Sequence, residues 1–317
     1  MRKAIEFLAK AAVATALLLY LFYQIGVQQI VNVLPRLELL YFMLFGAVFF
    51  ASLFLGVINI KLLLDGLGYR LPFKKIAQYY ITSWSLGLYA PGKLGEFSLV
   101  YLLKREKIGM GQSMAISVID KVITFIVFGT AAVTGFIVFL TFIESLWLLS
   151  LLMLGLAAAL YFLLSETGRA ILKKYILRRF AAKFSGFNTT MRLFLKEKKK
   201  VLIYNVILTV VKLHLMALSI SLLFISFGTH VSFFYTLLII AIGTIIALIP
   251  VTFSGLGVRE AASVYLFSKL GVDPAVTLTV FLVALITNFM VSALFVLLVL
   301  KRMKLYDEMR EAKEMLR

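Results

Sequence analysis

Long apolar runs separated by short charged loops dominate the hydrophobic pattern of this chain. A helix of about 20 apolar residues is long enough to cross the roughly 30 Å hydrocarbon core of a bilayer. Six runs meet that requirement: 4–23, 39–64, 111–143, 146–164, 201–227 and 274–300. Because only helices and closed barrels satisfy their backbone groups in lipid, the pattern predicts an all-α polytopic membrane protein with six transmembrane helices.

Another apolar run stops before it completes a crossing. Residues 76–90 end at the motif Pro-Gly-Lys-Leu-Gly-Glu at 91–96, and only seven residues, 97–103, precede the charged group at 104–107. Seven helical residues rise about 10 Å, which is far less than the membrane thickness. We therefore expect a re-entrant helical hairpin that enters and leaves on one side.

The same arrangement occurs near the C-terminal end. Residues 231–249 run into the motif Ser-Gly-Leu-Gly-Val-Arg-Glu at 254–260, and 260–270 lead back out. Both motifs place glycines before a glutamate, and both continue with Val-Tyr-Leu at the same offset. This match indicates an internal repeat within a single membrane domain spanning 1–317, with units at about 39–143 and 201–300. The two hairpins are expected to enter from opposite faces, which makes the repeats inverted.

Charge orients this topology in the membrane. The chain has 33 Lys and Arg against 15 Asp and Glu, a formal charge of +18. Basic residues favour cytoplasmic loops, where they also meet anionic lipid. We therefore expect a multi-pass cell-membrane protein with both termini in the cytoplasm. The basic stretch 166–200 is expected to be a cytoplasmic helical arm on the headgroups.

The composition also indicates which ligands and partners to expect. The chain is 62% hydrophobic and contains no Cys and only two His, so we expect neither a metal site nor any other cofactor. Nucleic acid is not an expected partner, because no basic segment lies in a separate soluble fold. The expected partners are membrane phospholipids, and a homodimer remains open.

Several charged residues are placed at bilayer depth, where each costs several kcal/mol unless it is paired or hydrated. Asp120, Lys121 and Lys212 lie near the middle of their predicted helices, and the other four lie at the hairpin tips. Glycines at the tips permit sharp turns that expose backbone N–H groups to an anion. The candidate substrate-binding residues are Lys93, Glu96, Asp120, Lys121, Lys212, Arg259 and Glu260, with Gly92, Gly95, Gly255 and Gly257. Four positive charges face three negative ones, a balance that favours an anionic guest.

A purely structural interpretation stays open for these charges. Glu96 and Glu260 could cap their helices and pair with the neighbouring Lys93 and Arg259, which would hold the hairpins shut. Asp120 could likewise form a static ion pair with Lys212. Aromatic residues of the first hairpin, Trp84 among them, are interpreted as packing or interface anchors.

At these residues the chain resembles a known family. The stretch 90–96, the Asp120-Lys121 pair and the stretch 250–260 are similar to the flippase-like membrane domain of lysylphosphatidylglycerol synthases. The resemblance implies an inverted-repeat membrane domain that moves phospholipids between leaflets. We expect a stand-alone member without the aminoacyl transferase domain. It has Lys at 93, and Asp-Lys at 120–121, where arginine is common in relatives.

The function expected from the sequence is a lipid translocase of the flippase or scramblase type. It would move an anionic phospholipid or lipid-phosphate headgroup through a polar cavity at the membrane midplane, and no enzymatic activity is expected. The alternative is a secondary transporter of a small anion or of a polyprenyl-phosphate carrier. An intramembrane enzyme using Ser254 and Glu260 has the weakest support.

Overall fold

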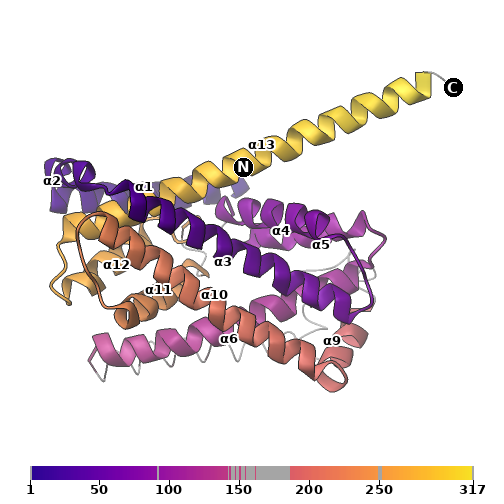
Figure 1. Cartoon of the computed structure of the whole chain (residues 1–317), viewed down its shortest axis with the longest axis horizontal. Coiled ribbons are helices and arrows are strands. Elements are labelled where there is room, and N and C mark those ends of the chain that lie inside the picture. Colours follow the sequence, from indigo (N-terminus) through magenta and orange to yellow (C-terminus); the bar gives the residue numbers. More distant parts are fainter. Residues whose placement is uncertain are drawn as a thin grey trace.

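The computed structural model describes residues 2–90, 93–141, 186–248 and 252–315, together with positions 143, 147, 150, 154 and 161. Within these residues the chain is helical and has no β-strand (Figure 1). The elements are α1 (Arg2–Ile25), α2 (Val27–Val33), η1 (Leu34–Arg36), α3 (Leu39–Gly66), α4 (Phe73–Leu88), η2 (Leu94–Ser98), α5 (Leu99–Lys104), α6 (Met110–Phe139), α9 (Phe187–Lys196), α10 (Lys199–Ser226), α11 (Phe233–Leu248), α12 (Val258–Ser268) and α13 (Pro274–Met315).

Four of the described helices, α3, α6, α10 and α13, are long and apolar enough to cross a membrane. The helices on either side of Gly26 add a fifth span if they are counted together, although the chain bends by 81° there. Gly26 has a φ of 87°, a conformation that glycine adopts without steric cost. The prediction of an all-helical membrane protein is confirmed. The predicted crossing at 146–164 and the first part of the basic arm, 166–185, lie outside the described residues apart from the single positions named above.

The chain folds back sharply after α4 and again after α11. Gly95 in η2 packs directly on the backbone of Leu86 and Gly87, so closely that no side chain would fit between them. Gly255 packs in the same way on Ala247 in the last turn of α11. Each returning segment therefore lies against the end of the helix that precedes it.

The helix lengths of the two halves match. Helices α3 and α10 both have 28 residues, and α4 and α11 both have 16. The returning segment η2–α5, Leu94 to Lys104, is as long as α12, which has 11 residues. The contacts between elements match as well, because α4 packs on α13 while α11 packs on α6.

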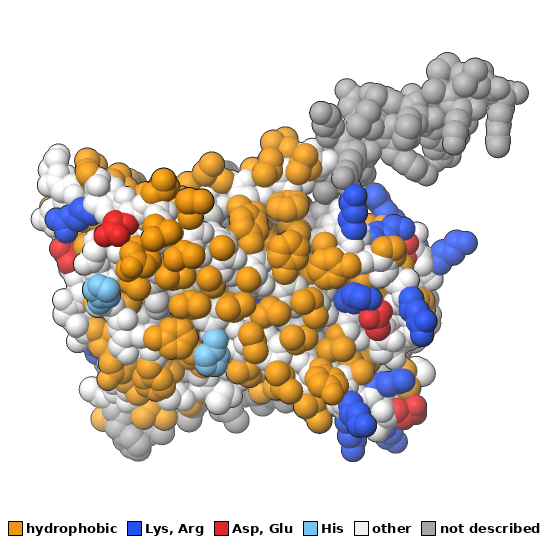
Figure 2. Space-filling view, in the orientation of Figure 1, with side chains coloured by type: hydrophobic (Ala, Val, Ile, Leu, Met, Phe, Trp, Pro, Cys, Tyr) orange, Lys and Arg blue, Asp and Glu red, His pale blue; other side chains and the backbone are white. Residues whose placement is uncertain are grey.

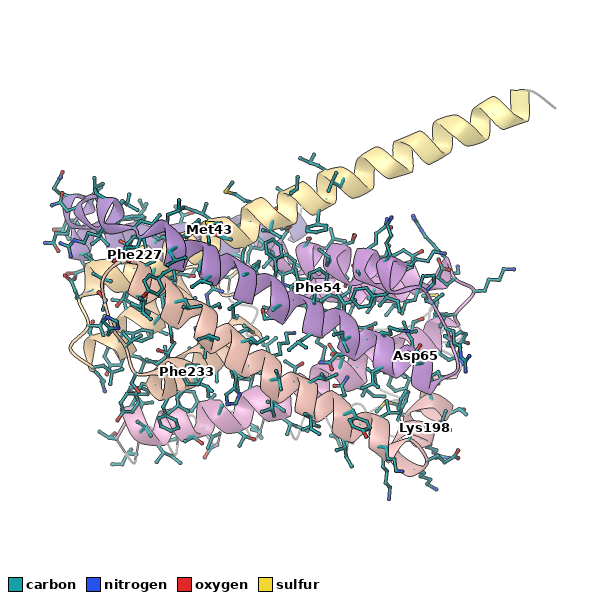
Figure 3. The ribbon with its side chains drawn as sticks, viewed as in Figure 1. Met43, Phe54, Asp65, Lys198, Phe227 and Phe233 are labelled. Atoms are coloured by element: carbon teal, nitrogen blue, oxygen red, sulfur yellow. The ribbon has the colours of Figure 1, made fainter. Side chains whose placement is uncertain are left out.

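Among the described helices, α3 and α10 form the most extensive pair, and they run in opposite directions. The Glu38 N–H, at the start of α3, donates to the Ser226 carbonyl at the end of α10 at 2.7 Å. At the other end, Gly66 of α3 lies beside Val201 of α10. Figure 3 shows the same relation, with Asp65 close to Lys198 at one end and Met43 close to Phe227 at the other.

The surface has an apolar belt between two polar ends. Figure 2 shows hydrophobic side chains over the middle of the bundle and a concentration of Lys and Arg at the end where α3 finishes and α10 begins. The opposite end carries few charges in this view. This distribution suits a bundle that spans a membrane with its basic end toward anionic headgroups.

Candidate functional site

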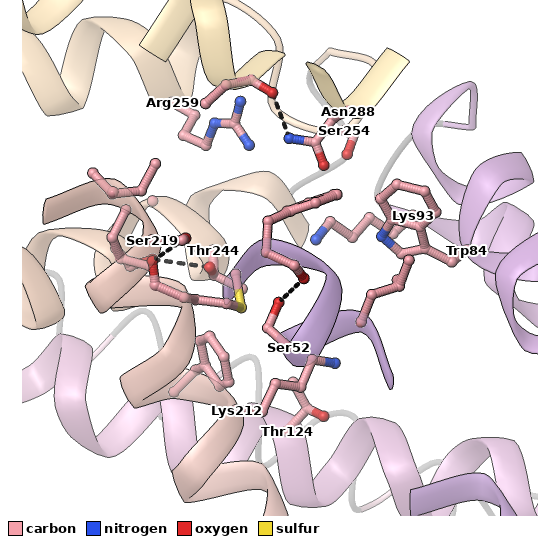
Figure 4. Close-up of a pocket in the computed structure, with 18 of the residues that line it drawn as sticks. Ser52, Trp84, Lys93, Thr124, Lys212, Ser219, Thr244, Ser254, Arg259 and Asn288 are labelled. Carbon is pink, nitrogen blue, oxygen red and sulfur yellow. Dashed lines mark hydrogen bonds between the residues drawn. The ribbon is translucent and has the colours of Figure 1, made fainter. Parts of the chain in front are cut away.

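A cavity of about 170 Å³ lies within the bundle, and the described residues that line it include four cationic side chains and one carboxylate. The charged residues are Lys93, Glu96, Lys121, Lys212 and Arg259. Figure 4 shows Lys93, Lys212 and Arg259 reaching this cavity from different sides. All five were candidates from the sequence, and the tertiary fold brings them together although they span 93–259.

Lys93 belongs to the tight connection between α4 and η2. Its backbone is left-handed, with a φ of 57°, a conformation that few non-glycine residues adopt. Within the described residues its ammonium group makes no ion pair or hydrogen bond. Among the residues that the structure describes, Lys93 is therefore a cation without a partner, and it lines the cavity.

Glu96 is held by its backbone while its carboxylate faces the cavity. The Glu96 N–H donates to the Lys93 carbonyl at 3.0 Å, and the Ser83 hydroxyl of α4 donates to the carbonyl oxygen of Glu96. The absence of a side chain at Gly87 leaves room for the Cγ atom of Glu96 against α4. This arrangement fixes the position of residue 96 and leaves the side chain as its adjustable part.

Lys121 of α6 is the partner of Glu96. Its Nζ atom contacts Glu96 Oε2 and lies 3.1 Å from Oδ2 of Asp120. Asp120 is buried and does not line the cavity. Of the pairings left open by the sequence, Glu96 therefore pairs with Lys121 instead of Lys93, and Asp120 pairs with Lys121 instead of Lys212.

Lys212 enters the cavity from α10. Its Nζ donates a long hydrogen bond of 3.4 Å to the hydroxyl of Tyr80 on α4, and no carboxylate pairs with it within the described residues. A neutral phenol compensates a buried ammonium group only partly. Lys212 is thus a second cation with unused capacity to bind an anion.

At the second tip, Arg259 and Glu260 form a closed pair. Both Arg259 Nε, at 3.1 Å, and Arg259 Nη2, at 2.7 Å, donate to Glu260 Oε1. The N–H of Gly257 donates to the other carboxylate oxygen at 2.7 Å, which caps α12. Glu260 is fully buried and does not line the cavity. This is the capping arrangement that the sequence left open for Glu260, and only Arg259 of the pair faces the cavity.

Three of the four predicted glycines shape the tips and do not line the cavity. Gly95 and Gly255 permit the close backbone contacts described above, and Gly257 lies against the backbone of Ala14 in α1. Gly257 has a φ of 82°, so a glycine is favoured there. The fourth, Gly92, lies outside the described residues.

The cavity also contains polar and aromatic residues that the sequence analysis did not assign to it. Ser52, Thr244, Ser263 and Asn288 were not singled out, and Trp84 was interpreted as an anchor. Ser52 and Thr244 donate to carbonyl groups of their own helices at 2.8 Å, which leaves their oxygen atoms as acceptors. Isolated hydroxyl residues in apolar helices carry no signal of the direction they face, and this explains why they were missed.

No group of three His, Asp or Glu side chains that could hold a metal ion occurs in the part of the chain that the structure describes.

The chain is similar in sequence to known membrane proteins. The family model described as "Lysylphosphatidylglycerol synthase TM region" matches residues 7–295. A UPF0104 membrane protein of Methanothermobacter thermautotrophicus is 32% identical over 118 residues, which cover 37% of this chain and 35% of that protein. A UPF0104 membrane protein of Methanocaldococcus jannaschii is 23% identical over 270 residues, covering 76% of this chain and 79% of that protein.

Proposed function

The chain belongs to the family of lysylphosphatidylglycerol synthase transmembrane regions, and from that premise we propose that it is a lipid translocase of the flippase or scramblase type. Its substrate is an anionic phospholipid or a lipid phosphate, whose headgroup crosses the membrane through the cavity. The family match and the membrane helices support a lipid-related function, and the chemistry of the cavity supports an anionic substrate.

The observation that carries this proposal is a cavity in which two cations form no ion pair with any residue that the structure describes. Lys93 and Lys212 have no carboxylate partner within the described residues, while Lys121 and Arg259 are paired. An ammonium group in a low-dielectric site is costly without a counter-ion, so these two lysines favour the entry of an anion into the cavity. A phosphate offers several acceptor oxygens to such a cluster.

The size and lining of the cavity favour a headgroup over a complete lipid. Pockets that enclose drug-sized ligands measure roughly 300–1,000 Å³, and this one measures about 170 Å³. Its apolar wall includes Phe45, Phe49 and Trp84. We infer that only the phosphate and its immediate substituents enter, while the acyl or isoprenoid chains stay in the surrounding bilayer.

We also propose the topology that such transport needs: six crossings and two re-entrant hairpins in an inverted repeat. The matched helix lengths and the antiparallel α3–α10 pair support it. Because α3 begins at Leu39 and α10 at Lys199, matching positions lie 160 residues apart, which pairs Ser52 with Lys212. Both residues line the cavity, as do Trp84 and Thr244, the matching pair of α4 and α11. The proposed site therefore lies where the two repeats meet.

The proposed setting is the cell membrane, with both termini and the basic end of the bundle in the cytoplasm. The transported lipid is not chemically modified by the protein, and no cofactor takes part. Membrane phospholipids are the proposed partners, and nucleic acid is not. The concentration of Lys and Arg at one end of the bundle supports this orientation (Figure 2).

Reconstitution tests the proposal. The purified chain is placed in liposomes with fluorescent lipids of anionic or zwitterionic headgroup, and loss of label from the inner leaflet is followed with a membrane-impermeant quencher. We expect faster movement of the anionic lipid than in protein-free liposomes, slowed by Lys93→Met, and recovery of the lipid unmodified. Movement equal to protein-free liposomes would refute the proposal, and efflux of a small trapped anion instead would favour the secondary transporter.

A further inference from the structure

The two glutamates of the repeated motifs, Glu96 and Glu260, differ sharply in their surroundings. Glu260 accepts hydrogen bonds from the Gly257 N–H and from two nitrogens of Arg259, and it is fully buried. Glu96 lines the cavity, and within the described residues its carboxylate has Lys121 as its ion-pair partner. The carboxylate of Glu260 is held in its helix cap, whereas the carboxylate of Glu96 faces the space that a substrate would occupy.

We propose that Glu96 is a built-in competing anion, which pairs with Lys121 at the cavity wall and is displaced from it by the substrate phosphate. The inference deepens the proposed function and rests on it, because it takes the guest to be a phosphate-bearing lipid. Lys121 then exchanges one anionic oxygen for another during each transport cycle, and the released Glu96 repels the bound phosphate and promotes its departure.

The geometry around Glu96 permits this exchange without unfolding the tip. The backbone of residue 96 is held by hydrogen bonds to Lys93 and from Ser83, so only the side chain has to move. Its Cγ atom packs on Gly87, whose missing side chain leaves room for the Glu96 side chain against α4. Lys121 keeps a second partner, Asp120 at 3.1 Å, which does not line the cavity and so remains in place when Glu96 leaves.

The cost of the exchange explains why the arrangement suits transport better than tight binding. A phosphate that gains Lys121 also breaks the existing ion pair, so the net gain is smaller than that of a contact with a free cation. Weak net binding allows release on the far side of the membrane. Lys93 and Lys212, which form no ion pair among the described residues, supply the attraction that starts the exchange.

Binding measurements test the inference with a probe that carries only the phosphate diester, without a further headgroup. Dihexyl phosphate has one negative charge and no headgroup beyond its phosphate. Trp84 lines the cavity and is one of only two tryptophans, so in a Trp147→Phe background its fluorescence reports binding to the full chain in nonionic detergent. We expect saturable binding, and about tenfold or more tighter binding in Glu96→Gln, because the competing carboxylate is gone.

Two matched variants accompany this comparison. Asp65→Asn also removes one negative charge, but from a surface pair with Lys61 at 2.9 Å outside the cavity, and it should leave the affinity unchanged. Glu96→Asp keeps the charge and shortens its reach toward Lys121, so it should bind several-fold tighter than the original chain. That variant carries the test if Glu96→Gln fails to fold.

Transport supplies a second readout. In liposomes, Glu96→Gln should show a lower half-saturating lipid concentration together with a lower maximal rate, since binding improves and release slows. A merely structural glutamate would not lower both values.

The two ideas fail in different ways. If dihexyl phosphate binds neither the original chain nor the variants, the proposed function is overturned, and this inference with it. If it binds the original chain but Glu96→Gln and Glu96→Asp bind no tighter, the competing role of Glu96 is refuted and the phosphate site stands.

Discussion

A methyl group in place of the hydrogen of Gly95 would lie 2.1 Å from the carbonyl oxygen of Leu86. Contacts this short between a Cβ atom and backbone are not sustained in folded proteins, so the first tip depends on glycine at this position. The same holds at the second tip, where a Cβ atom on Gly255 would lie 2.7 Å from the Cα atom of Ala247. At both tips, therefore, the returning segment is held by a glycine packed on a helix backbone.

Gly95→Ala and Gly255→Ala should each destabilise the protein by about 1–3 kcal/mol, because the returning segment has to move off its helix. The matched control is Gly46→Ala in α3, where no atom lies within 4 Å of the added carbon and a small stabilisation is expected. Thermal stability in detergent, followed by the fraction of protein that remains monodisperse after heating, measures the difference. Equal stability of all three variants would contradict the close packing of the tips.

Lys93 and Lys121 should respond differently to removal of their charge. Lys93→Met removes an unpaired cation and should weaken binding of an anionic lipid about 10- to 150-fold. Its effect on stability should stay below about 1 kcal/mol. Lys121→Met leaves Glu96 and Asp120 without their common partner and should cost about 3–5 kcal/mol of stability. Binding is read from Trp84 fluorescence and stability from thermal unfolding.

If Lys93→Met instead unfolds the protein while Lys121→Met is tolerated, the assignment of paired and unpaired cations is wrong. Adding Glu96→Gln to Lys121→Met provides the control. The double variant should recover part of the lost stability, since one of the two stranded carboxylates is removed.

Variants of the Arg259–Glu260 pair test whether Arg259 binds the headgroup or only stabilises the fold. Arg259→Met alone strands a fully buried carboxylate and should be strongly destabilising. The combination of Arg259→Met with Glu260→Gln should restore stability, because no unpaired charge remains. Lipid transport by this double variant should stay low if Arg259 contacts the headgroup. Transport near the rate of the original chain would show that Arg259 is structural.

Glu106, in the turn between α5 and α6, gives the protein a stability that depends on pH. Burial favours its neutral form, but hydrogen bonds donated by Lys75 at 2.8 Å and by Tyr79 at 2.6 Å outweigh burial and hold the pKa of Glu106 below its ordinary value of 4.5. The folded state then binds this proton more weakly than the unfolded state does. The contribution is therefore present above about pH 4.5 and is lost as the pH falls through the lowered pKa.

The corresponding experiment compares thermal unfolding of the original chain and Glu106→Gln from pH 7 to pH 3. The original chain should be more stable at pH 7, and the gap should close at the acidic end. Because Lys75 is exposed, the difference should stay within about 1 kcal/mol. A gap that is constant across this range would contradict the role of the Glu106 carboxylate.

The proposed topology predicts which single cysteines can be labelled from each side, and the absence of native cysteine makes the test direct. Cysteines at positions 74 and 104 flank the first hairpin and should both react from the cytoplasmic side only. Cysteines at 229 and 273 flank the second and should react from the other side only. Opposite labelling of 74 and 104 would turn the first hairpin into a complete crossing and remove the inverted repeat.

Much of the architecture could be predicted from the sequence because it depends on local features. Apolar runs of sufficient length specify membrane helices wherever they occur, and glycine-rich motifs interrupt them whatever surrounds them. The predicted run 39–64 corresponds to α3 at Leu39–Gly66, and 201–227 corresponds to α10 at Lys199–Ser226. The charged residues of the motifs were also identified as cavity candidates, since charge at bilayer depth requires a reason.

The assignment of partners could not be predicted in the same way. Lys121 reaches Glu96, 25 positions earlier in the chain, only because α6 passes beside the first tip. Asp120 is adjacent to Lys121 in sequence, yet it lies outside the cavity lining because successive helical residues point about 100° apart.

The sequence by itself determined that this protein is an all-helical membrane protein with charged glycine motifs at two interrupted helices, since helix length, apolarity and turn chemistry are properties of short segments. Only the tertiary structure decided that Glu260 is a sealed helix cap while Glu96 faces the cavity, and that Trp84 and Asn288 join the site. Which side chains share a cavity depends on how each helix is rotated and which helix it packs against. That is set by the packing of the whole bundle, which no single segment specifies.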